Sequence, residues 1–206
     1  MTHISVEGMD GVGKSTVCEL LASRTGYRFV DRPLRYLFSE DGDPELYIRI
    51  RDRVNSSPDR VFTSWFYGLS NIFLYERFGG EDIVTDRHML SNYLWSGTDG
   101  NRQVYETLLG LIGAPDLTFL LYADRESIRG RLRSRDEGDP DLPKADDTEV
   151  AYSKMESFLR EHDMPYLRID STGMRPDEVC DLMVAELERR GNIRCQRGSW
   201  RRSSLT

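Results

Sequence analysis

The sequence predicts a single α/β domain built around a five-stranded parallel sheet with helices on both faces. Short β-rich stretches alternate with longer helical stretches along most of the chain, which is the pattern of consecutive strand–helix–strand units. A length of 206 residues is enough for one domain to bury a full core. A glycine-rich turn also separates the first strand from the first helix, where open parallel sheets bind their ligands.

Each element of this fold has its own signal in the sequence. The five strands are expected, in chain order, at residues 3–8, 27–31, 82–86, 116–122 and 166–170. The helices with the clearest patterns are expected at residues 14–26, 44–54 and 58–78, and further helices follow the later strands. Gly26 stops the first of these helices, and Pro58 starts the third. The resulting domain spans residues 1–190.

Charge and composition exclude several classes of protein. The net charge of −7 disfavours a dedicated binder of duplex DNA, which normally carries a basic face. No apolar run approaches the roughly 20 residues of a membrane span, and a strand beginning at His3 leaves no room for a signal peptide. Three scattered cysteines without metal-ligand spacing predict free thiols in a reducing cytoplasm.

The last 16 residues, 191–206, differ from the rest of the chain. They contain four arginines and no acidic residue, and they show no helical or strand periodicity. The sequence predicts a flexible arginine-rich tail here. Contact of this tail with nucleic acid or with a partner protein is the less favoured alternative.

The turn after the first strand carries a phosphate-binding motif, G-x-x-x-x-G-K-[ST], formed by Gly8, Gly13, Lys14 and Ser15. Its glycines let successive backbone N–H groups point at one anion, and the following helix adds its positive N-terminal dipole. Lys14 is expected to reach the β- and γ-phosphates of ATP, and Ser15 to bind Mg²⁺. The expected nucleotide-binding residues are Gly8, Met9, Asp10, Gly11, Val12, Gly13, Lys14, Ser15 and Thr16.

Asp10 is an unusual residue for a loop that binds anions. A carboxylate weakens phosphate binding there unless it faces another partner, and a nucleotide hydrolase has no evident need of it. An enzyme that phosphorylates a small hydroxylated acceptor does need such a group, because a carboxylate at the rim of the loop can hold the acceptor hydroxyl. Asp10 therefore favours a kinase.

Residues 7–16, EGMDGVGKST, closely resemble the phosphate loop of thymidylate kinases, where E-G-x-[DE]-x-x-G-K-[ST]-T is usual. A second signature of that family, D-R-[YH] followed by a serine, resembles Asp86, Arg87, His88 and Ser91. Weaker similarities cover residues 114–135 and 167–172. Together these segments cover most of the first 190 residues in the same order.

The resemblance implies a P-loop three-layer fold of the nucleoside-monophosphate-kinase type, with strand order 2-3-1-4-5 and a short lid near residues 135–147. The implied activity is transfer of the ATP γ-phosphoryl to a (deoxy)nucleoside monophosphate, with an acceptor like dTMP. Asp10 would meet the acceptor's sugar, and Arg87 would clamp its α-phosphate. Asp86 would position Mg²⁺ or orient Arg87.

The same resemblance assigns residues near the end of the domain. Arg131 and Arg135 share one face of the helix before the lid, so one or both would act as an internal arginine finger on the transferring group. Asp170 and Thr172 occupy the segment that the family places near adenine. The nature of the donor, ATP or GTP, stays open.

Departures from the family leave the acceptor open. After the second strand only Arg32 and Pro33 of the usual R-E-P-G-G-T remain, and Trp65 stands about where a base-binding arginine is expected. Phe62, Trp65 and Phe66 either stack on the base or belong to the helix's core face. The lid after Arg135 is strongly acidic.

Three alternative activities therefore remain beside a monophosphate kinase. These are a deoxynucleoside kinase, a kinase that acts on a modified base or nucleotide in DNA, and a nucleotide hydrolase without an acceptor. A homodimer is also an open alternative for the assembly.

Overall fold

The computed structural model of the chain describes residues 1–39 and 42–191 and confirms the predicted α/β architecture. Five parallel strands form one sheet in the order β2-β3-β1-β4-β5, as predicted. The strands are β1 (His3–Glu7), β2 (Arg28–Asp31), β3 (Ile83–Asp86), β4 (Leu117–Tyr122) and β5 (Tyr166–Asp170). Their carboxyl ends form one edge of the sheet, which carries the phosphate loop.

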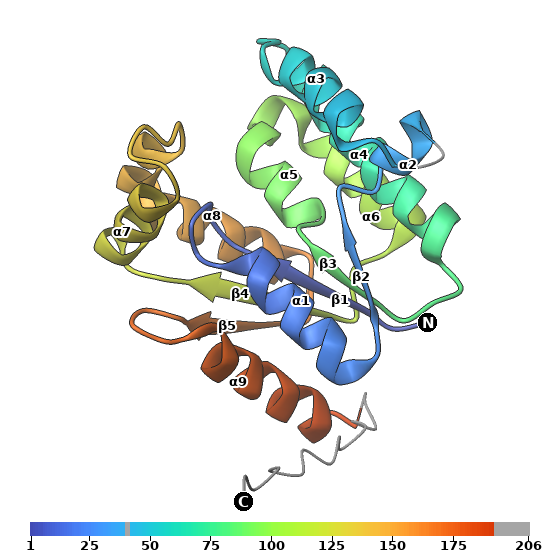
Figure 1. Cartoon of the computed structure of the whole chain (residues 1–206). Helices are drawn as coiled ribbons and strands as arrows, with labels where there is room; N and C mark the ends of the chain where they lie inside the picture. The colour runs from blue at the N-terminus through green and yellow to red at the C-terminus, as the bar shows by residue number, and fades with distance from the viewer. Residues whose placement is uncertain (40–41, 192–206) are drawn as a thin grey trace, which may run out of the picture.

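Helices cover both faces of the sheet, as Figure 1 shows. On one face lie α1 (Lys14–Thr25) and α9 (Pro176–Arg189), which pack against each other. The other face carries α4 (Arg60–Phe78), α5 (Met89–Ser96), α6 (Arg102–Ile112) and α8 (Thr148–Glu161). The remaining elements are α2 (Arg35–Phe38), α3 (Pro44–Asn55), α7 (Arg125–Arg135) and the 3₁₀ turns η1 (Asp99–Asn101) and η2 (Leu142–Asp147).

The helix expected at 58–78 begins two residues later than predicted. The side chain of Asp59 accepts hydrogen bonds from the backbone N–H of Val61 at 2.9 Å and of Phe62 at 3.1 Å. Asp59 is therefore the N-cap, and its carboxylate satisfies two of the N–H groups that a helix start leaves unpaired. Pro58 precedes this cap.

The central strand β1 is buried along its whole length although three of its five residues are polar. Each polar side chain has partners inside the fold. His3 bonds Tyr75 at 2.7 Å and Thr85 at 2.9 Å, and the hydroxyls of Ser5 and Thr118 lie 2.9 Å apart. Buried polar groups are tolerated when they are bonded in this way. The third, Glu7, lies beside the phosphate loop.

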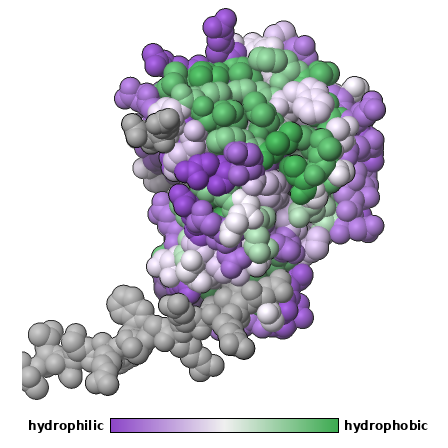
Figure 2. Space-filling view, turned by 90° about the vertical axis from the view of Figure 1, so that its right-hand side faces the viewer, coloured by the Kyte–Doolittle hydropathy of each residue, from purple (hydrophilic) through white to green (hydrophobic). Residues whose placement is uncertain are grey.

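An apolar surface lies on the outer side of α2 and α4. Figure 2 shows apolar residues gathered over the upper part of this face. The exposed large apolar side chains of α2 and α4 are Leu37, Val61, Phe62, Trp65 and Leu69. Phe62 and Trp65 are 51% and 41% exposed, so these two aromatic residues do not belong to the core.

Other sequence predictions concern the ends and surroundings of the domain. The predicted tail, 191–206, lies outside the described residues except for Gly191. Within residues 1–39 and 42–191 the structure has no helix long and apolar enough to cross a bilayer. The helix α2 is an element that the sequence did not predict.

Candidate active site

The phosphate loop joins the end of β1 to the start of α1. Gly8 has a φ of +140°, and a side chain there would collide with the carbonyl oxygen of Leu121. Lys14 is buried, and its Nζ donates to the carbonyl oxygen of Met9 at 2.7 Å, across the loop. Burial lowers the pKa of Lys14 to about 8. The loop thus holds a desolvated cation ready for an anionic ligand.

Two side chains from distant segments fasten this loop. The hydroxyl of Tyr152 accepts from the backbone N–H of Met9 at 3.3 Å and donates to the carbonyl oxygen of Leu121. Arg131 donates to the carbonyl oxygens of Val12 at 3.1 Å and Ser171 at 2.8 Å. The guanidinium predicted to be an arginine finger therefore lies against the back of the loop.

Ser15 and Asp86 lie together beside the loop. The Ser15 hydroxyl donates to Oδ2 of Asp86, while Oδ1 of Asp86 is buried without a hydrogen-bond partner. A hydroxyl next to a carboxylate with a spare oxygen is a donor set that suits Mg²⁺. Within the described part of the chain no cluster of three or more His, Cys, Asp or Glu side chains forms a metal site. Mg²⁺ does not need one, because nucleotide phosphates and water complete its shell.

Three charges converge at the rim of the loop. Arg87 Nη2 donates to Oδ1 of Asp10, and Nζ of Lys144 lies 3.9 Å from Oδ2 of the same carboxylate. Burial raises the pKa of Asp10, but the nearby charges of Arg87, Lys14 and Lys144 outweigh burial and bring this pKa below its ordinary value. Lys144 also bonds Asp141 at 2.7 Å and lies 4.7 Å from the ring centre of Trp95.

Arg87 occupies a strained backbone position. Its φ of +76° lies in the left-handed region that residues with side chains rarely adopt, and its N–H donates to the carbonyl oxygen of Val6 at 3.0 Å. Arg32, another predicted substrate-binding residue, has a φ of +44°. Strain of this kind concentrates at functional sites, where the surrounding structure maintains it.

The residues after β2 form a second basic group near this edge of the sheet. The side chain of Arg32 is about half exposed and lies 4.0 Å from Asp31. Arg35 Nη2 lies 3.3 Å from Asp31 and donates to the Tyr36 hydroxyl at 2.6 Å, and its Nε is buried without a partner. Asp31 is the register partner of Asp86, so both carboxylates end their strands side by side.

Two of the three predicted base-stacking residues line a second pocket. Phe62 and Phe66 line a pocket of about 590 Å³ between α2, α3 and α4, and Phe66 stacks on Phe38 with ring centres 6.4 Å apart. Trp65 is exposed on α4. Phe66 also packs edge-on against Tyr67, with ring centres 5.2 Å apart.

The remaining predicted residues lie at or just after the ends of α7 and β5. Arg135 donates through Nε to Asp139 at 2.7 Å and lies 3.3 Å from Asp141. Thr172 accepts from the N–H of Asp124 at 2.9 Å, and its own N–H donates to Asp170 at 2.9 Å.

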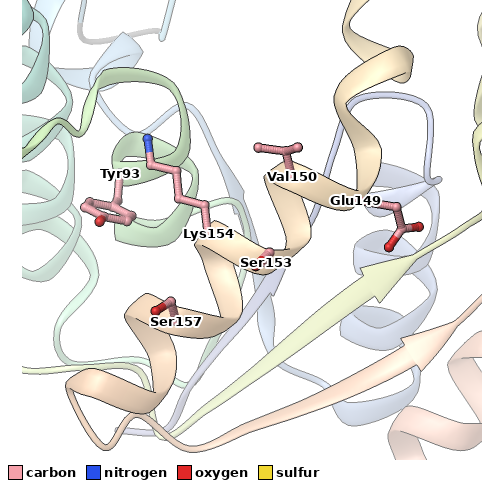
Figure 3. A pocket seen from close by; sticks show the side chains of 6 residues that line it. All are labelled: Tyr93, Glu149, Val150, Ser153, Lys154 and Ser157. Carbon is pink, nitrogen blue, oxygen red and sulfur yellow. The ribbon is translucent and has the colours of Figure 1, made fainter.

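A pocket of about 570 Å³ lies between α5 and α8 and contains none of the predicted site residues. Figure 3 shows Lys154 of α8 extending toward the end of α5, next to Tyr93. Its Nζ donates to the carbonyl oxygens of Leu94 at 2.9 Å and Gly97 at 2.8 Å. This lysine caps the last carbonyls of α5 and joins the two helices.

A sequence profile described as an AAA domain matches residues 4–152, which is well over half of the chain. The chain belongs to the AAA domain family. The chain is similar to the cytidylate kinase of Roseiflexus castenholzii. The two are 26% identical over 215 residues, which cover 89% of this chain and 92% of the relative.

Solved structures share the fold. Thymidylate kinase from Candida albicans has a TM-score of 0.67 at 17% identity, covering 93% of this chain and 92% of that one. A deoxyadenosine kinase from M. mycoides has a TM-score of 0.61 at 17% identity, covering 91% and 100%. The predictions of a P-loop nucleotide kinase and of its fold are confirmed. The names of these proteins differ in the acceptor, which is cytidylate, thymidylate or deoxyadenosine.

Proposed function

We propose that this AAA domain protein transfers the γ-phosphoryl of ATP to a (deoxy)nucleoside monophosphate, with dTMP as the most favoured acceptor. The observation that carries the proposal is the pair of cations, Arg87 and Lys144, on the two oxygens of Asp10. A bare nucleoside needs a hydroxyl-binding carboxylate, but it does not need two cations beside it. A monophosphate needs both kinds of group.

The donor half of the site follows from the loop. Lys14 and the loop amides would hold the β- and γ-phosphates, and Asp170 and Thr172 would lie near the adenine. Ser15 and Asp86 would hold Mg²⁺, which neutralises charge on the phosphates when bound. Asp86 contacts Ser15, so the same carboxylate would orient the metal-binding hydroxyl.

The acceptor half would position the attacking hydroxyl. Asp10 would accept a hydrogen bond from a sugar hydroxyl, and Arg87 would exchange part of its contact with Asp10 for the acceptor's α-phosphate. Arg32 would add positive charge from the end of β2. Holding both substrates in line supplies most of the catalysis in phosphoryl transfer, because the protein performs little covalent chemistry.

The two predicted arginine fingers would have different roles. Arg131 donates to the carbonyl oxygen of Val12, and we propose that it supports the loop from behind. Arg135 pairs with Asp139 and Asp141 in the lid, and it would have to leave these acids to reach a phosphate. We therefore propose that Arg135 is the arginine finger and that a movement of the lid brings it to the transferring phosphate.

An acceptor screen tests the proposal. Purified protein is incubated with Mg²⁺ and either ATP or GTP, against all common nucleosides and nucleoside monophosphates, and product is measured by chromatography. We expect transfer from ATP to a monophosphate, with dTMP the best. Transfer only to nucleosides would support a deoxynucleoside kinase instead. Acceptor-independent hydrolysis would support a nucleotide hydrolase. DNA that carries a modified base or nucleotide is included as a further acceptor, and its phosphorylation would support the DNA-directed alternative.

A further inference from the structure

Glu7 is a fully buried carboxylate that the proposed function does not yet use. It ends β1, directly before the phosphate loop, and has no exposed surface. The backbone N–H of His88 donates to its Oε1 at 2.8 Å, and the hydroxyl of Ser91 donates to its Oε2. Burial raises the pKa of Glu7, and its bonds to Ser91, the charge of Arg87 and the His88 amide oppose that effect. A buried carboxylate is tolerated when hydrogen-bond donors surround it, so Glu7 is part of the structure of the site.

Ser91 connects Glu7 to Arg87. Its hydroxyl also accepts a hydrogen bond from Nη1 of Arg87 at 3.2 Å. An ionised carboxylate only accepts hydrogen bonds, so the Ser91 proton must point at Glu7, and its lone pairs are then left for the guanidinium. The charge of Glu7 thereby fixes the direction of the whole chain, from Arg87 through Ser91 to Glu7.

The two terminal nitrogens of Arg87 have different partners. Nη1 is held by Ser91, while Nη2 bonds Asp10 at the rim of the phosphate loop. About a third of the Arg87 side chain is exposed, so this end of the site is accessible to a ligand. The nitrogen held by Ser91 can stay in place while the nitrogen bonded to Asp10 exchanges its partner.

We propose that Glu7 is a positioning residue that acts through Ser91 to hold Arg87 for the acceptor's phosphate. This inference rests on the proposed function of Arg87 and adds a residue that acts on it from inside the sheet. Glu7 does not touch the substrate. It stabilises one geometry of the Arg87 guanidinium. The backbone of Arg87 is itself strained, so this geometry needs support from the surrounding residues.

Steady-state kinetics on the full chain test the inference, with dTMP as acceptor and ATP as donor. Glu7→Gln keeps the shape of the side chain but removes its charge, so the Ser91 hydroxyl is free to rotate. We expect the KM for dTMP to rise on the order of 10-fold, the scale of one lost charge-assisted hydrogen bond. The KM for ATP should stay within about twofold. Ser91→Ala should give the same pattern and covers the case that Glu7→Gln does not fold.

A double-mutant cycle separates positioning from a general structural role. In an Arg87→Met background, Glu7→Gln should raise the KM for dTMP no further, because the residue it acts on is gone. Glu149→Gln, which removes an exposed carboxylate bonded to Tyr122, is the matched control and should change neither KM. Equal losses for ATP and dTMP, or full additivity with Arg87→Met, would overturn the inference.

The proposed function and this inference fail in different ways. If Arg87→Met leaves the KM for dTMP unchanged, Arg87 does not bind the acceptor and both ideas fall. If Arg87→Met raises that KM while Glu7→Gln and Ser91→Ala leave it unchanged, only the role of Glu7 is wrong.

Discussion

The two halves of the candidate site are built in different ways. The phosphate-binding part of the proposed donor half is one continuous segment, residues 8–16, in which backbone geometry and a single buried lysine make the anion-binding surface. The acceptor half brings together Asp10, Arg87 and Lys144, which come from three separate segments of the chain. Its geometry exists only in the folded sheet.

This difference separates what each half contributes to function. A loop made of backbone groups binds any triphosphate in much the same way, because every nucleotide presents the same phosphates. A cluster of charged side chains selects among acceptors, because each charge favours a particular group on the ligand. We therefore expect mutations in the donor half to remove activity, and mutations in the acceptor half to change which substrate is used.

The largest effect should come from the donor half. Lys14→Ala removes the cation on the β- and γ-phosphates, and we expect kcat to fall by at least ~10²-fold, the scale of one electrostatic contact in the transition state. The measurement is the transfer rate at saturating ATP and dTMP. Arg133→Ala, which removes an exposed cation on α7, is the control. Activity within a few-fold of wild type would show that the loop is not the donor site.

Arg87→Met should affect only the acceptor. The variant keeps the bulk of the stem but loses a charge-assisted pair with the α-phosphate, on the order of 2–5 kcal/mol in a desolvated site. Titration should show weak binding of monophosphates and near-normal binding of ATP. Unchanged monophosphate binding would contradict the proposed role and favour a nucleoside acceptor.

Asp10→Asn should separate the halves most clearly, since Asp10 belongs to the loop but faces the acceptor. The amide removes a negative charge near the bound phosphates, so ATP affinity should stay equal or become slightly tighter. Transfer should fall because the acceptor hydroxyl is no longer held in line. Both quantities are measured with and without dTMP. Normal transfer would mean that Asp10 has no acceptor role.

The smallest expected effect is the uptake of a proton by the protein when ATP binds. The pKa of Lys14 is lowered to about 8, so between pH 8 and its ordinary value near 10.5 the unfolded chain binds more protons at this residue than the folded chain does. The contribution of Lys14 to stability therefore rises with pH through that window. Bound phosphates favour the charged amine, so ATP binding at pH 9 should take up close to one proton.

Calorimetry in two buffers of different ionisation enthalpy measures that proton. Lys14→Arg carries a permanent charge and is the matched control, because its binding of ATP should take up none. Equal uptake by the wild type and by Lys14→Arg would place the titrating group elsewhere.

The position of the phosphate loop between β1 and α1 was predicted correctly because its signal is local. The spacing of Gly8, Gly13 and Lys14 predicts a loop in which Lys14 bonds a carbonyl only five residues away. The strand–helix alternation predicts a parallel sheet, and the family resemblance supplies its strand order. The late start of α4 also has a local cause, the cap at Asp59, which the more visible Pro58 obscured.

Only some of the residues that we propose for the acceptor half could be identified from the sequence, and the reason is physical. Asp10 and Arg87 stand in recognisable motifs, but the approach of Lys144 to Asp10 depends on how the lid folds back over the loop. Lys144 had one available signal, as one of only three lysines in the chain and the one within the acidic lid. Helical spacing alone did not reveal that Phe62 and Trp65 are exposed on the outer side of α4.

The attachment of α7 to the phosphate loop has a mechanical consequence for the lid. Arg131 ties the helix to Val12 and Ser171, and Leu132 packs so closely on Gly11 that a Cβ at Gly11 would lie 2.9 Å from it. The helix is thus anchored at its middle and cannot swing as a lever without distorting the donor site. The lid motion that we propose for residues 136–147 would therefore have to bend the chain after Arg135, where α7 ends. Amide hydrogen exchange should accordingly be faster across residues 136–147 than within α7.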